Sequence, residues 1–137
     1  MMSNHLFISK GGVSDLASCA TILLTCLGVE EIHRRESSNY VSGEYFVASF
    51  FGAKIVVAGC DEEDFPQHDY WIAIGGDGVG GAQVQSLGGF VELMARLLAL
   101  SGFSVARPLQ FGQLGGEYLI YKTLEDNKNQ VVVKRAI

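Results

Sequence analysis

The chain has few prolines, no long hydrophobic run and no excess of basic residues. Its two prolines, Pro66 and Pro108, argue against a long extended linker. The longest nearly apolar stretch, residues 16–29, is interrupted by serine, threonine and glycine and falls short of the roughly 20 apolar residues that span a bilayer. No basic segment followed by an apolar one opens the chain, so no signal peptide is expected. These absences predict one cytoplasmic domain, residues 1–137, with no membrane contact.

Cysteine is also scarce, and three cysteines cannot all pair within the chain. Cys19 and Cys26 are seven positions apart in a predicted helix, so their Cα atoms lie about 10 Å apart. A disulfide needs a separation below about 7 Å. We therefore expect Cys19, Cys26 and Cys60 to be reduced and mostly buried, as small hydrophobic residues of a cytosolic protein.

The balance of charge is acidic, with 15 acidic residues against 10 basic ones and a net charge of −5. Nucleic-acid binding calls for a basic face, so this composition argues against a nucleic-acid partner. An acidic protein instead associates readily with a basic partner.

Motifs for catalysis or metal binding are missing. No Gly-x-Ser-x-Gly occurs, and the acidic run 61–64 lacks the residue order of a calcium loop. The run could be a solvated hairpin tip, a protein-binding patch or, third in order, a site for a hard cation. The glycine-rich segment 75–81 lacks both the Lys-Ser/Thr ending of a phosphate loop and the dinucleotide spacing, and His5, His33 and His68 are far apart. The sequence predicts no catalytic residue, no metal site and no cofactor, so a non-enzymatic protein.

What the chain does contain is a repeated plan. Residues 14–46 read as a helix, a glycine, a charged strand, a loop and then Gly-Glu-Tyr at the start of an apolar strand. Residues 86–119 repeat this order, again with Gly-Glu-Tyr. The plan indicates two similar α-β-β-β halves packed around one core.

The first predicted helix begins at Ser14, a good N-cap, and ends at Leu27 before Gly28. Apolar residues cover nearly its whole circumference, so we expect the helix to be largely buried or covered by a partner. Residues 30–36 are charged apart from one isoleucine, which predicts a solvated edge strand or a loop.

The second predicted helix is capped by Ser86 and ended by Gly102. Its apolar residues recur at spacings of three and four, which is typical of an amphipathic helix. Glu92 and Arg96 are expected to pair across one turn on the polar face. The predicted inward stripe consists of Leu87, Phe90, Val91, Met94, Leu97, Leu98 and Ser101.

Strands account for most of the remaining chain. Residues 44–51 and 53–60 form a predicted hairpin with two apolar faces, typical of a central strand covered on both sides. With further strands near each terminus and on either side of the second helix, the predicted order is β-α-β-β-β-β-α-β-β-β. Because hairpins dominate, we expect an α+β fold with a mixed, mainly antiparallel sheet and two helices.

Residues 36–46, Glu-Ser-Ser-Asn-Tyr-Val-Ser-Gly-Glu-Tyr-Phe, form the most distinctive segment. Its serines and asparagine favour a turn, Gly43 permits an unusual backbone dihedral, and Tyr45 and Phe46 enter the core. The region from Arg35 to Tyr70 also resembles a motif of small bacterial proteins. Some of these look like the immunity proteins of contact-dependent growth inhibition systems. The resemblance implies a cytoplasmic, single-domain protein that neutralises a toxin by covering its active site.

The leading hypothesis is therefore an acidic bacterial immunity protein that acts as a toxin inhibitor through protein–protein interaction. Its partner would be a cognate toxin domain, expected to be basic and for example a nuclease, which acidic side chains would steer into contact. The candidate partner-binding residues are Glu62, Glu63, Asp64 and Asp69, followed by Glu30 and Glu31.

Two alternatives stay open. The first is a small-molecule enzyme or ligand-binding domain with a pocket near segment Gly75–Gly81, Tyr70, Trp71 and His68. The second is a homo-oligomer in which the apolar first helix is the interface.

Overall fold

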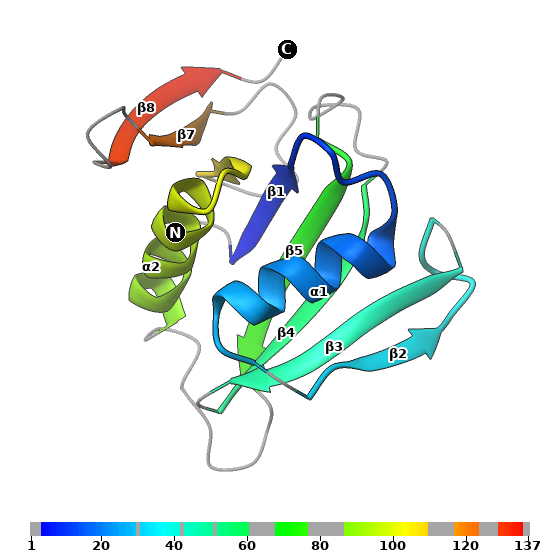
Figure 1. The fold of residues 1–137 in the computed structure, drawn as a ribbon. Coiled ribbons are helices and arrows are strands. Elements are labelled where there is room, and N and C mark those ends of the chain that lie inside the picture. Colours follow the sequence, from blue (N-terminus) through cyan, green and yellow to red (C-terminus); the bar gives the residue numbers. More distant parts are fainter. Residues whose placement is uncertain are drawn as a thin grey trace.

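The computed structural model describes residues 4–29, 31–41, 43–50, 52–60, 68–76, 87–109, 117–123 and 129–135. These residues form two helices and one eight-stranded sheet (Figure 1), which confirms the predicted α+β fold. In chain order the elements are β1 (His5–Ser9), α1 (Leu16–Cys26), β2 (His33–Glu36), β3 (Glu44–Phe50), β4 (Ala53–Gly59), β5 (Tyr70–Gly76), α2 (Leu87–Leu100), β6 (Ser104–Pro108), β7 (Glu117–Thr123) and β8 (Asn129–Arg135).

The strands lie in the order β2-β3-β4-β5-β1-β6-β7-β8, and every neighbouring pair is antiparallel. The first strand of the chain, β1, thus lies inside the sheet between β5 and β6. It joins the four strands β2 to β5 to the three strands β6 to β8. At the far end from β8, the terminal strand β2 has four exposed residues, so of the two predicted alternatives for residues 30–36, edge strand or loop, residues 33–36 form the solvated edge strand.

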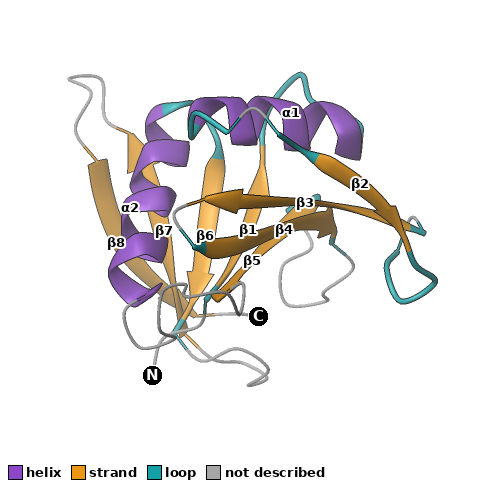
Figure 2. Ribbon diagram, turned by 90° about the horizontal axis from the view of Figure 1, so that it is seen from below, coloured by secondary structure: helices purple, strands orange, loops and turns teal. Residues whose placement is uncertain are grey.

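Both helices cover the same face of the sheet (Figure 2). α1 packs on β3 and β4, α2 packs mainly on β6 and β7, and the two helices touch each other. Side chains alternate between the two faces of a strand, so every second strand residue points into the layer between sheet and helices. Leu6, Ile55 and Ile72 are fully buried there. Complete burial of one such side chain stabilises the fold by about 1.5–3 kcal/mol.

Both helices end in the same way. Gly28 follows α1 with φ of 78° and Gly102 follows α2 with φ of 94°, a region that favours glycine. The backbone N–H of Val29 donates to the carbonyl five residues earlier at 2.9 Å, and that of Phe103 does the same at 3.0 Å. This is the Schellman pattern, and Val29 and Phe103 are buried, as the accompanying hydrophobic contact requires.

The start of α1 lies one residue beyond the prediction. Asp15, not Ser14, is the N-cap. Its carboxylate accepts the backbone N–H of Ser18 at 2.8 Å and the Ser18 hydroxyl at 2.9 Å. A carboxylate offers one oxygen to each of these donors, whereas a serine has a single side-chain oxygen. The predicted cap of α2, Ser86, lies outside the described residues.

One face of α1, and not nearly its whole circumference, is buried. The prediction that all three cysteines are mostly buried is wrong for Cys26, which is exposed, and holds only in part for Cys60. Val29 returns beneath the last turn of α1 and fills the core there, so Cys26 stays outside. All three cysteines are thiols and not disulfides, as predicted. The exposed face of α1 consists of Ala17, Ser18, Thr21, Thr25 and Cys26.

The buried stripe of α2 is turned slightly from the predicted one. Leu97, predicted to face inward, is 39% exposed, and Leu93 and Leu100 are exposed beside it. Two small residues, Ala95 and Ala99, are buried instead, because their short side chains let the helix approach the sheet closely. The buried residues of this stripe are Val91, Met94, Ala95, Leu98 and Ala99, and Phe90, predicted to face inward, packs half-buried against the same core.

The face of the sheet away from the helices carries a second, smaller hydrophobic cluster centred on Phe7 and Ala106. Beside it Tyr40, from the β2–β3 connection, stacks on Tyr45 and Trp71 with ring centroids 4.4 and 5.8 Å apart. The distinctive segment 36–46 thus supplies an aromatic side chain to this face. Along β3 and β4 the same face ranges from the buried Ala58 to the exposed Ser49 and Lys54, so the expectation of a hairpin covered on both sides is wrong.

Candidate functional site

A cluster of polar side chains lies between α2 and the strands β6 and β7. Glu92 of α2 pairs with Arg96 at 2.9 Å, as the sequence predicted. The same carboxylate accepts from the Arg107 guanidinium at 3.3 Å and from the Tyr121 hydroxyl. Arg107 and Tyr121 are 2% and 1% exposed. Besides the predicted pair of Glu92 with Arg96, the sequence offers one signal for this cluster, a single charged residue, Arg107, in the short strand β6.

The chemistry of this cluster is that of a structural clamp. Burial, reinforced by the hydrogen bond to Glu92, raises the pKa of Tyr121 to about 12. The phenol therefore stays protonated at neutral pH and donates to Glu92. A buried guanidinium without a carboxylate is costly, so Glu92 holds α2 against β6 and β7 through Arg107.

The predicted acidic residues fall into two places. Asp69 is exposed immediately before β5, and its carbonyl accepts the backbone N–H of Cys60 at 2.8 Å. Cys60 and Asp69 thus join the two ends of a connection that contains Glu62, Glu63 and Asp64, which lie outside the described residues.

Asp15, at the start of α1, belongs to the same place as Asp69. Burial raises the pKa of the Cys19 thiol to about 12, and the negative charges of Asp15 and Asp69 add to the shift. Burial is also the main reason that the pKa of Tyr70 is raised, and the same two carboxylates add to that shift. Two acidic side chains from different elements therefore act on one end of the core, and Cys19 is an inert thiol.

Glu31 lies elsewhere. Its side chain is 85% exposed and 3.2 Å from His33. When the strand register is extended from β2 through β3 and β4, Glu31 is level with Gly75 of β5. Gly75 is six residues further along the chain than Asp69. At about 3.3 Å per residue, Glu31 and Asp69 are separated by roughly 20 Å along the strands alone. The structure does not bring these two candidates together, and Glu30 lies outside the described residues.

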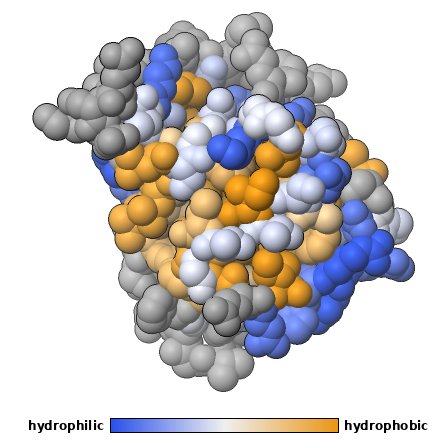
Figure 3. Space-filling model, viewed as in Figure 1, coloured by the Kyte–Doolittle hydropathy of each residue, from blue (hydrophilic) through white to orange (hydrophobic). Residues whose placement is uncertain are grey.

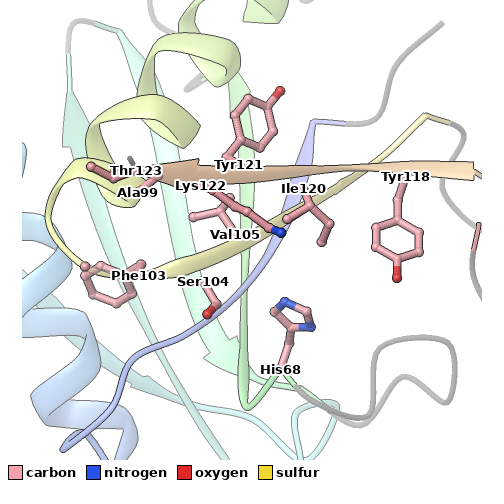
Figure 4. Close-up of a pocket in the computed structure, with 11 residues that line it drawn as sticks. His68, Ala99, Phe103, Ser104, Val105, Tyr118, Ile120, Tyr121, Lys122 and Thr123 are labelled. Atoms are coloured by element: carbon pink, nitrogen blue, oxygen red, sulfur yellow. The ribbon is translucent and has the colours of Figure 1, made fainter. Parts of the chain in front are cut away.

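One cavity of about 540 Å³ opens beside β6 and β7 (Figure 4). Lys122, Ile120 and Tyr118 extend from β7 towards His68, while Tyr121 points to the opposite side. Ser104 completes the polar lining. Burial lowers the pKa of His68, so its imidazole is neutral at pH 7. His68 was predicted to line a pocket, but Gly75 lies at the other end of β5 and does not contribute.

A second cavity, of about 510 Å³, lies along the edge formed by β2 and β3. Its charged lining residues are Glu31, His33, Arg35 and Lys54. The space-filling view shows strongly hydrophilic residues gathered on the β2 side of the molecule (Figure 3).

Other predicted chemistry can be compared with the described residues. Within them, no three His, Cys, Asp or Glu side chains lie close enough to hold a metal ion. No described helix is long and apolar enough to cross a membrane. Of the glycine-rich segment 75–81, Gly75 and Gly76 end β5 and residues 77–81 lie outside the described part.

Comparisons of the chain with models of protein families, with curated proteins and with solved structures give no match.

Proposed function

We propose that this chain is a small protein-binding module, most concretely an immunity protein that covers and neutralises a basic toxin domain. The observation that carries the proposal is the acidic end of the molecule, which we define as Asp15 and Asp69. Asp15 caps α1 and Asp69 immediately precedes β5, and the charges of both carboxylates help to raise the pKa values of Cys19 and Tyr70. Cys60 and Asp69 also fix the ends of the connection that contains Glu62, Glu63 and Asp64.

Electrostatics makes this end suited to a basic partner. A net charge of −5 attracts a cationic domain from a distance, and a local group of carboxylates orients its approach. Asp69 is exposed, so its interaction with a partner does not compete with core packing.

The test measures association with the toxin domain encoded beside this chain's gene, by stopped flow at several salt concentrations. Asp69→Lys should slow association by about tenfold at low salt and flatten its salt dependence, because rim charges act on encounter. Glu117→Lys is the matched control, with the same charge change on an exposed residue of β7, three strands away from β5. Equal rates for the two variants would remove the acidic end from the interface. Absence of any complex would remove the immunity proposal itself.

A second candidate function is binding of a small anionic molecule in the cavity beside Lys122. Its volume of about 540 Å³ is typical of small-molecule sites, and Lys122, Ser104 and His68 supply one charge and two polar groups. Isothermal titration with small carboxylates and phosphates would test it. Heat of binding that Lys122→Met abolishes favours this function, and no heat with any of them speaks against it.

A further inference from the structure

The strand β2 presents an open edge. It pairs with β3 on one side, and no strand in the described part of the chain pairs with its other side. All four of its side chains are exposed. Open edges carry backbone donors and acceptors that another strand can use.

The hydrogen-bond pattern shows which residues face this open edge. The Ser37 N–H donates to the Gly43 carbonyl at 3.0 Å, and this pair continues the β2–β3 register. Backbone groups alternate in direction along an antiparallel strand, so His33 and Arg35 bond towards β3. Arg34 and, one step before the strand, Ile32 then direct their N–H and C=O groups to the open edge. Consistently, the Arg34 carbonyl is reached by the Arg35 guanidinium at 3.3 Å.

The residues whose backbone groups do not face the open edge carry side chains that change in charge along the strand. Glu31, His33 and Arg35 alternate with Ile32 and Arg34, so they share one face of the sheet, and all three line the edge cavity. The row runs from negative through histidine to positive. Read in the opposite direction, it is complementary to itself.

We propose that a second copy of this chain pairs its β2 with this edge, antiparallel, about a two-fold axis at His33. Glu31 then lies opposite the partner's Arg35, and Arg35 opposite the partner's Glu31. Ile32 and Arg34 exchange backbone hydrogen bonds with the partner's Arg34 and the partner's Ile32, which are the groups that face outward. The two sheets become one continuous sheet through an isologous contact.

On the face that lines the edge cavity, and at the centre of the pairing, the charges favour this register. Two-fold pairings centred on Arg34 or Arg35 place two guanidiniums opposite each other, and one centred on Glu36 places two carboxylates opposite each other. Like charges directly across a strand pair are unfavourable. Of the registers centred on a β2 residue, only the one at His33 is free of such a central clash. A short edge strand with charged side chains normally prevents pairing with unrelated strands. Here the same charges are complementary to those of a second copy of the chain.

The test is a charge swap, followed by sedimentation of the full chain from about 1 to 500 µM. Wild type should show a concentration-dependent monomer–dimer equilibrium. Glu31→Arg and Arg35→Glu should each weaken the dimer by about tenfold or more, because each places like charges opposite twice. The double variant Glu31→Arg/Arg35→Glu should restore it.

Lys54→Glu is the matched control, since Lys54 is an exposed cation on the same face but two strands inside the edge. It should leave the dimer unchanged. Circular dichroism verifies that each variant is folded. The proposal is overturned by a wild type that stays monomeric at every concentration. It is equally overturned by a dimer that Arg35→Glu leaves intact, or by a double variant that does not recover. This test needs no toxin, so its outcome is separate from that of the immunity proposal.

Discussion

The two α-β-β-β halves of this chain share a local plan but differ in their place in the sheet. In each, a helix ends in a Schellman turn, a strand follows, and a Gly-Glu-Tyr segment opens the next strand. Tyr45 and Tyr118 both lie on the face away from the helices, whereas their neighbours Phe46 and Leu119 pack into the main core. The likeness therefore extends from sequence to side-chain direction.

The path of the chain through the sheet breaks the likeness. After α1 the chain passes to the outer edge at β2 and returns inward through β3 and β4. After α2 it enters the middle of the sheet at β6 and moves outward to β8. The same local plan thus leaves β2 open to solvent and places β6 beside β1. The local sequence therefore specifies which residues form a helix or a strand. The neighbouring strands in the sheet decide whether such a strand is at the edge or inside.

The outer faces of the helices differ as well. α1 shows small and polar side chains to solvent, and α2 shows Leu93, Leu97 and Leu100. In the described part of the chain, α2 and not α1 carries a carboxylate that bonds to buried polar side chains. This residue is Glu92, and its partners are Arg107 and Tyr121. The half with β6 is therefore clamped by a polar cluster, whereas the half with β2 rests on apolar packing.

The largest expected effect concerns that clamp. Glu92→Leu should lower the free energy of unfolding by about 2–4 kcal/mol, because Arg107 would stay buried without this carboxylate. The value lies towards the low end for buried pairs since Glu92 is 32% exposed and screened by water. Urea denaturation provides the measurement. Thr25→Leu on the exposed face of α1 is the matched control, expected within about 0.5 kcal/mol. Equal effects of the two changes would contradict the clamp.

The next largest effect is expected at alkaline pH, where the polar cluster around Tyr121 should lose part of its contribution to stability. The pKa of Tyr121 is raised to about 12, so folding favours its protonated form. Its contribution to stability is complete below the unfolded pKa of about 10 and is lost as pH rises towards 12. The free energy of unfolding of wild type should therefore fall between pH 10 and 12 more steeply than that of Tyr121→Phe. Identical slopes for the two proteins would show that the Tyr121 phenol does not contribute.

The two helix-ending glycines offer a matched pair of smaller changes. Gly28→Ala should cost about 1–2 kcal/mol, the strain of a left-handed backbone. Gly102→Ala should cost more, because the new Cβ would lie 2.6 Å from Lys10 Nζ, which bonds the Ser101 carbonyl at 2.8 Å. Thermal unfolding of the two variants side by side measures the difference. A smaller loss for Gly102→Ala would mean that Lys10 moves away freely.

The smallest effect is one of reactivity alone. In the native protein a thiol reagent should modify Cys26 rapidly, Cys60 more slowly and Cys19 only after unfolding. Cys19 is fully buried and its pKa of about 12 keeps it protonated. Mass spectrometry of labelled peptides assigns the sites. Rapid labelling of Cys19 would contradict the docking of α1 on the sheet.

The sequence by itself determined the elements that depend on near neighbours. Helix spans follow from apolar spacing, Gly28 and Gly102 mark the helix ends, and Glu92 with Arg96 is a one-turn pair. The solvated edge at 33–36 follows from a run of charge. Each of these rests on interactions within a few residues, which the order of residues encodes directly.

Only the tertiary structure decided which distant residues meet. Arg107 and Tyr121 join Glu92 because β6 and β7 pack against α2. Asp15 and Asp69 come together because the start of α1 and the residue before β5 both lie near Cys19 and Tyr70. The exposure of Cys26 likewise depends on where the chain turns after α1. The order of strands in the sheet sets these contacts. That order results from the packing of the whole core. It cannot be predicted from the hydrophobic period or the capping residues of a single segment.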